Sequence, residues 1–102
     1  MSQIKQPEPH TVTVSNAEDY RNSYANSVQV RMSVWDFFMV FGTMQQTSKE
    51  EVMVENFQGI YLSPQQAKAL ANVLGHNIAQ YEQTFGEIAL EPQYMQPNGP
   101  VH

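Results

Sequence analysis

Cysteine is absent from the 102 residues of this chain. Its absence excludes disulfide bonds, a zinc–thiolate site and a thiol nucleophile. At this length the chain forms one domain, and one small apolar core supplies only a few kcal/mol of net stability. Association with another chain is therefore an ordinary way for such a protein to become more stable.

Basic residues are also few, and they are scattered along the chain. There are five of them against ten acidic residues, for a net charge of −5. A nucleic-acid binder needs a basic face to replace the counterions along the phosphates. We therefore expect no nucleic-acid partner.

Long hydrophobic runs are missing as well. The longest apolar run is Phe37–Phe41, whereas a membrane span needs about 20 residues. The amino terminus lacks the basic region and the apolar run of a signal peptide. We expect a cytoplasmic protein without a membrane partner.

No group of residues in the sequence is typical of catalysis or of cofactor binding. His10, His76 and His102 do not form a metal-ligand set, because two lie in polar end segments and His76 has no ligating neighbour one helical turn away. The sequence contains no glycine-rich phosphate loop, no nucleophile with a base and no pair of carboxylates. We therefore predict a protein that is not an enzyme and that holds no cofactor or metal.

Other polar residues have structural interpretations. Asp36 falls in a predicted turn, where its carboxylate would accept hydrogen bonds from backbone N–H groups. Asn26 and Asn77 are expected to bridge the helix and the sheet through amide hydrogen bonds. Tyr81 is expected to pack its ring on the sheet, with Glu82 on the flank of the helix.

Strand signals fill the middle of the chain. Val28, Val30 and Met32 alternate with polar residues, which indicates a strand with one buried face. A turn over Ser33–Asp36 leads into the apolar strand Phe37–Phe41, which makes a hairpin. The remaining predicted segments are a polar connection, a third strand, a bulge or bend and the continuation of that strand: Thr43–Lys49, Glu51–Glu55, Asn56–Gly59 and Ile60–Leu62.

One long helix follows these strands. Ser63 suits the N-cap position and Pro64 the first helical position. The pattern stays helical to Phe85, and Gly86 is expected to supply a left-handed C-cap. The apolar residues recur at spacings of three and four, and they predict one stripe that packs on the sheet: Ala67, Leu70, Ala71, Leu74, Ile78, Tyr81 and Phe85. Ile88 and Leu90 are expected to fold back onto the core.

The fold class that follows is α+β, with an antiparallel sheet of three to four strands packed against one long carboxy-terminal helix. The domain is expected over residues 11–91, between polar, disordered tails at 1–10 and 92–102. Thr11–Val14 could add a short edge strand. Ala17–Asn22 reads equally well as a helical turn or as an irregular polar lead-in.

Several short pieces of the sequence resemble a known family, the small bacterial and archaeal proteins described as domain of unknown function 3467. The resemblance covers Tyr24 to Ile88, and the family brings no accepted activity, cofactor or catalytic residue. This chain departs from the usual pattern at Phe38 and Val40, where more polar residues are expected. The pieces that carry the resemblance are Tyr24-Ala25-Asn26, Asp36-Phe37, Phe41-Gly42, Leu62-Ser63-Pro64, Ala67-Lys68, Asn77, Tyr81-Glu82 and Phe85-Gly86 with Ile88.

If the helix covers one face of the sheet, the other face presents Phe38, Val40 and Met53. Such a patch on a small protein often marks an interaction surface. We expect it to join copies of the chain, and the alternative is coverage by Val12, Val14 and Tyr20 of the amino-terminal segment. The interface residues that the sequence predicts are Arg31, Trp35, Phe38, Val40, Met53 and Glu55.

Two function classes are therefore open. The first is a small homo-oligomeric adaptor or structural module that also binds a protein partner of unknown identity. The second is a chaperone-like binder of extended or unfolded segments, since the layout is loosely similar to that of the SecB export chaperone. Architecture alone does not decide between them.

Overall fold

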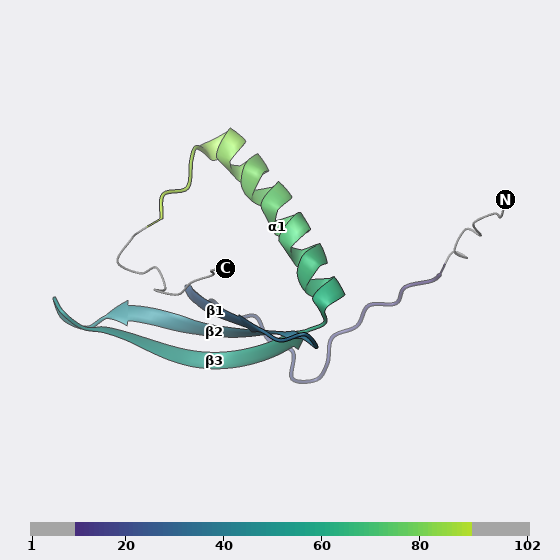
Figure 1. The fold of residues 1–102 in the computed structure, drawn as a ribbon, viewed down its shortest axis with the longest axis horizontal. Coiled ribbons are helices and arrows are strands. Elements are labelled where there is room, and N and C mark those ends of the chain that lie inside the picture. Colours follow the sequence, from purple (N-terminus) through teal and green to yellow (C-terminus); the bar gives the residue numbers. More distant parts are fainter. Residues whose placement is uncertain (1–9, 91–102) are drawn as a thin grey trace.

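A computed structural model describes residues 10–90. Three strands form one antiparallel sheet in the order β1-β2-β3, and a single long helix follows them (Figure 1). The strands are β1 (Ser27–Met32), β2 (Phe37–Gln46) and β3 (Val52–Leu62), and the helix is α1 (Pro64–Phe85). The predicted α+β class is confirmed.

The first hairpin is present as predicted, but Val28, Val30 and Met32 are exposed in the single chain and not buried as expected. Val30 of β1 lies opposite Met39 of β2, and Arg31 lies opposite Phe38. Residues directly opposite one another share a face of the sheet, so the apolar residues of β1 are on the same face as Met39. Ser33 holds the turn, because its Oγ accepts from the backbone N–H groups of Trp35 at 3.0 Å and Asp36 at 3.3 Å.

The second hairpin is longer than predicted. β2 continues through residues 43–46, which were predicted to belong to the polar connection, whereas β3 continues past the bulge as one strand, as predicted. The hydrophobic pattern missed residues 43–46 because Met44 is the one apolar residue among them, which leaves no apolar alternation. Thr47 closes the shorter connection, since its N–H donates to the carbonyl oxygen of Glu51 at 3.0 Å.

The predicted bulge near Asn56–Gly59 is confirmed. Phe41 lies opposite Gln58 and Gly42 lies opposite Asn56, so β3 contains one extra residue, Phe57. Gly42 is buried, and a Cβ atom at its position would lie 2.7 Å from the carbonyl oxygen of Glu55. Glycine is needed here because the bulged backbone approaches too closely for a side chain.

The amino-terminal expectations are corrected in one respect. Thr11–Val14 form no strand. Within Ala17–Asn22 the structure shows a single turn, in which the Tyr20 N–H donates to the Ala17 carbonyl oxygen at 3.0 Å. The irregular lead-in is therefore the better of the two predicted readings. The expected tails 1–10 and 92–102 lie, apart from His10, outside the described residues.

Both predicted cap residues are confirmed. The Ser63 Oγ accepts from the Gln66 N–H at 3.1 Å. At the other end the Gly86 N–H donates to the Glu82 carbonyl oxygen at 3.0 Å. The φ of 106° at Gly86 favours glycine, but its ψ of 168° is extended, so the cap does not have the left-handed helical conformation that was predicted. The Glu82 carboxylate also accepts from the Ile88 N–H at 3.0 Å, which fixes the chain after the helix.

The expected packing of the helix on the sheet is absent from the single chain. α1 rises from the end of β3 and diverges from the sheet (Figure 1), and none of its residues is buried. Across residues 10–90 no hydrophobic residue is buried, and Ile88 and Leu90 are exposed as well. The prediction that the apolar stripe covers its own sheet is therefore wrong.

Candidate functional site

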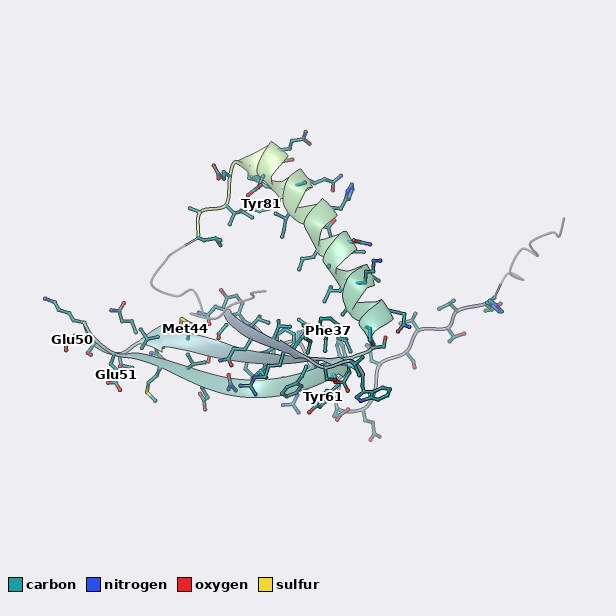
Figure 2. All side chains as sticks on the ribbon, in the orientation of Figure 1. Phe37, Met44, Glu50, Glu51, Tyr61 and Tyr81 are labelled. Carbon is teal, nitrogen blue, oxygen red and sulfur yellow. The ribbon has the colours of Figure 1, made fainter. Side chains whose placement is uncertain are left out.

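Within residues 10–90, an extensive apolar surface lies between the helix and the sheet. We call it the helix-side surface; it comprises the stripe of α1 and the face of the sheet on that side. Figure 2 shows Phe37 on the side of the sheet that faces α1, and Tyr61 on the opposite side. The residues of the surface are Leu70, Leu74, Ile78 and Tyr81 of the helix and Val28, Val30, Met32, Phe37, Met39, Phe41, Ile60 and Leu62 of the sheet.

The helical half of this surface is built by spacing. Leu70, Leu74, Ile78 and Tyr81 are three or four residues apart, so they fall on one side of α1. Leu74 remains 51% exposed and Ile78 41% exposed. The Tyr81 ring packs against that of Phe85, with centroids 4.9 Å apart, rather than on the sheet as predicted.

The strand half is built by register. Val28 lies opposite Phe41 and Val30 opposite Met39, while Met39 also lies opposite Ile60 on β3. These residues share one face of the central part of the sheet. Val30 is 57% exposed, so the face is open to solvent in the single chain.

The exposed area can be compared with that of known interfaces. A large side chain offers roughly 150–250 Å², and the exposed fractions of Leu70, Leu74, Ile78, Tyr81, Val28, Val30, Met32 and Ile60 leave on the order of 700 Å² per chain. A standard protein–protein interface buries about 800 Å² per partner. The helix-side surface is thus large enough for a specific contact.

The predicted interface on the opposite face is only partly assembled. Phe38 lies opposite Arg31 on one side and Tyr61 on the other, and its ring stacks on that of Tyr61 with centroids 4.3 Å apart. Phe38 also lies against Gly59, where an added Cβ would be 2.9 Å from the ring. Phe38 and Val40 are consequently half-buried within the chain.

Two predicted members of that interface lie elsewhere. Met53 is opposite Gln45 and Glu55 is opposite Thr43, beyond the bulge and toward the tip of the second hairpin. Gln45 is five positions along β2 from Val40, which is roughly 17 Å along a strand. The expected cluster of Phe38, Val40 and Met53 is therefore wrong.

The exposed aromatic residues of the opposite face are Tyr61 and, at the hairpin turn, Trp35. They are 66% and 80% exposed. Trp35 was among the predicted interface residues, but Tyr61 and Gly59 were not. The pairing of Tyr61 with Phe38 follows from the register of the second hairpin, which the bulge displaces by one residue.

The amino-terminal segment was expected to cover the Phe38 face, and it does not do so in the single chain. Val12, Val14 and Tyr20 are all exposed. Tyr20 and Tyr24 instead border a shallow open groove together with Phe57 and Ile60. Coverage of the Phe38 face by this segment is therefore not observed in the single chain.

The polar residues that the sequence singled out have local roles. The Asn26 amide accepts from the Met44 N–H at 2.6 Å and donates to the Met44 carbonyl oxygen at 3.1 Å, so it joins β2 to the residue before β1 and does not bridge the helix and the sheet. Asn77 is exposed on α1. The carboxylate of Asp36 accepts from the Ser33 hydroxyl at 3.3 Å, whereas the Ser33 side chain, not Asp36, caps the backbone N–H groups.

Residues 10–90 contain no group of three or more histidine, aspartate or glutamate side chains that could hold a metal ion. Over the same residues, no helix combines the length and the hydropathy that a membrane span requires.

A family model described as "Protein of unknown function (DUF3467)" matches residues 1–90. The chain belongs to the DUF3467 family. This match confirms the resemblance seen in the sequence and extends it to the amino terminus. No curated protein and no solved structure matches the chain.

Proposed function

We propose that this DUF3467 protein is a non-enzymatic, cytoplasmic interaction module that works as a homo-oligomer. One observation carries the proposal: no hydrophobic residue between positions 10 and 90 is buried in the single chain. Folding must offset about 1–2 kcal/mol of backbone entropy per residue, chiefly by burying apolar surface. A chain that folds in this shape needs a partner surface to supply that burial.

A second copy is a partner that is always available at the concentration of the chain itself. Its helix-side surface is also apolar, so each copy can cover the exposed apolar surface of the other. Homo-oligomers with closed symmetry are the common form among soluble assemblies. Charged residues such as Glu50 and Glu51 lie at the hairpin tip, outside this apolar surface (Figure 2).

Light scattering tests the proposal. The wild-type chain should show a mass of at least two copies of 11.6 kDa. Leu70→Glu combined with Ile78→Glu places charges where desolvation is costly, so this variant should fall to the mass of one chain. Asn72→Glu, on the polar side of α1, is the matched control and should keep the wild-type mass. A wild-type protein with the mass of one chain would refute self-association.

The alternative is a chaperone-like binder of extended polypeptide segments, and the edge of the sheet favours it. β3 is an eleven-residue edge strand, and its outer backbone groups could pair with an added strand. A permanently unfolded model polypeptide should then bind the oligomer and protect β3 amides from exchange. Binding that leaves the β3 amides unprotected would argue against this mode.

A further inference from the structure

The connection between sheet and helix fixes the direction in which α1 leaves the sheet. Only Ser63 separates the end of β3 from the start of α1. Ser63 is extended, with φ −65° and ψ 155°, and its side chain caps the helix. Pro64 disfavours a helical conformation at the preceding residue. To pack α1 on its own sheet, the chain would have to change the backbone angles of Ser63, and the hydrogen bond by which Ser63 caps the helix would be lost.

The two halves of the helix-side surface nevertheless match one another in size. The stripe runs from Leu70 to Tyr81, which is about 17 Å along α1. The apolar part of β2, the central strand, runs from Phe37 to Phe41, which is about 14 Å. A stripe of this length therefore spans the apolar part of the central strand.

The two halves also match in chemistry. The stripe of α1 carries no charged residue, since Lys68 and Glu82 lie off it by helical spacing. Glu82 is further engaged by the Ile88 N–H at 3.0 Å. The facing residues Val28, Val30 and Met39 of the sheet are apolar. Docking the stripe on these residues would strand no charge, because Glu55, which lies opposite Thr43 on the same face, is beyond them toward the hairpin tip.

We propose that α1 of each chain packs on the helix-side face of the partner's sheet, in a twofold dimer that exchanges helices. This inference rests on the proposed self-association and adds which surfaces meet. The occupant is a second copy, because it brings a stripe of the right length and an identical open sheet. The contact would bury on the order of 700 Å² per chain, close to the roughly 800 Å² of a standard interface.

Mixing two charged variants tests the exchange. The helix variant carries Leu74→Glu and Ile78→Glu, and the sheet variant carries Val30→Lys and Ile60→Lys. Each alone should lose the dimer, because it buries uncompensated charges on an apolar surface. In an equimolar mixture each mixed dimer contains one contact between a wild-type helix and a wild-type sheet. Its other contact places the Glu side chains of the helix variant against the Lys side chains of the sheet variant. The mass measured by light scattering should therefore double on mixing.

A like-charged sheet variant, Val30→Glu with Ile60→Glu, is the matched control and should not restore the dimer. If helices paired with helices and sheets with sheets, neither mixture would recover, and the exchange would be refuted. If both variants alone kept the wild-type mass, the helix-side surface would not be the contact, which would also refute it.

Because single variants can lose their fold, the wild-type chain provides a second measurement. A mixture of isotope-labelled and unlabelled wild-type chains should show contacts in filtered NMR spectra between α1 of one chain and β1–β3 of the other. A dimer whose only contacts between chains join helix to helix would overturn the exchange and leave self-association standing. A wild-type chain with the mass of one copy would overturn both.

Discussion

Truncation of the Leu74 side chain tests whether a second chain covers the apolar stripe of α1. In the single chain the side chain is 51% exposed, so about half of its apolar surface is still in water. If a second copy covers that remainder, it buries roughly 90 Å² of the Leu74 side chain. Leu74→Ala removes about two thirds of this area from the contact, which is worth about 1.5 kcal/mol per chain at about 25 cal/mol per Å².

A twofold dimer contains the change twice, so the loss is about 3 kcal/mol per dimer. That energy corresponds to a dissociation constant raised by roughly two orders of magnitude. Sedimentation velocity over a dilution series measures this constant directly. The helix itself should not weaken, because alanine is the best helix former.

Gln83→Ala is the matched control for this experiment. Gln83 lies on the side of α1 opposite to Leu74 by helical spacing, and glutamine and leucine have nearly equal helix propensities. The control should leave the dissociation constant unchanged. Equal constants for Leu74→Ala and Gln83→Ala would refute the claim that the stripe is covered by another chain.

Three further predictions concern other parts of the fold. Gly42→Ala should lower the free energy of unfolding by about 1–3 kcal/mol in chemical denaturation, because its Cβ would meet the Glu55 carbonyl oxygen at 2.7 Å; Gly75→Ala, which has open space, should instead be stabilising. Ser63→Ala should cost about 1 kcal/mol in thermal unfolding while Ser63→Asp should not, since aspartate also caps a helix, and equal losses would show that the cap is unimportant. Phe38→Glu should keep the mass of the assembly, as Asn72→Glu should, because Phe38 lies on the face opposite to the helix-side surface and stacks on Tyr61 within the chain. A folded Phe38→Glu protein with the mass of one chain would show that the face predicted from the sequence also joins copies of the chain.

The sequence predicts the elements of this protein because their signals are local. Ser63, Pro64 and Gly86 mark the helix ends by side-chain capping and backbone geometry, and the structure confirms each of them. The alternation of Val28, Val30 and Met32 likewise places these residues on one face of the first strand, although that face is exposed in the single chain.

The candidate site depends on signals that are not local. The bulge at Phe57 displaces the register of β3, and for this reason Met53 is paired with Gln45 and lies away from Phe38. Periodicity also shows that α1 has an apolar stripe, but it does not show which sheet the stripe meets. The one-residue connection at Ser63 directs α1 away from its own sheet, and this direction is seen only in the three-dimensional structure.

Thermal unfolding of the wild-type chain across a wide range of concentrations tests the central claim most directly. If a second copy supplies the core, folding and association are one process, and the midpoint temperature must rise as the protein concentration rises. Loss of helix signal should coincide with loss of the assembled mass at every concentration. A cooperative transition whose midpoint is the same at all concentrations, from a species with the mass of one chain, would contradict the account.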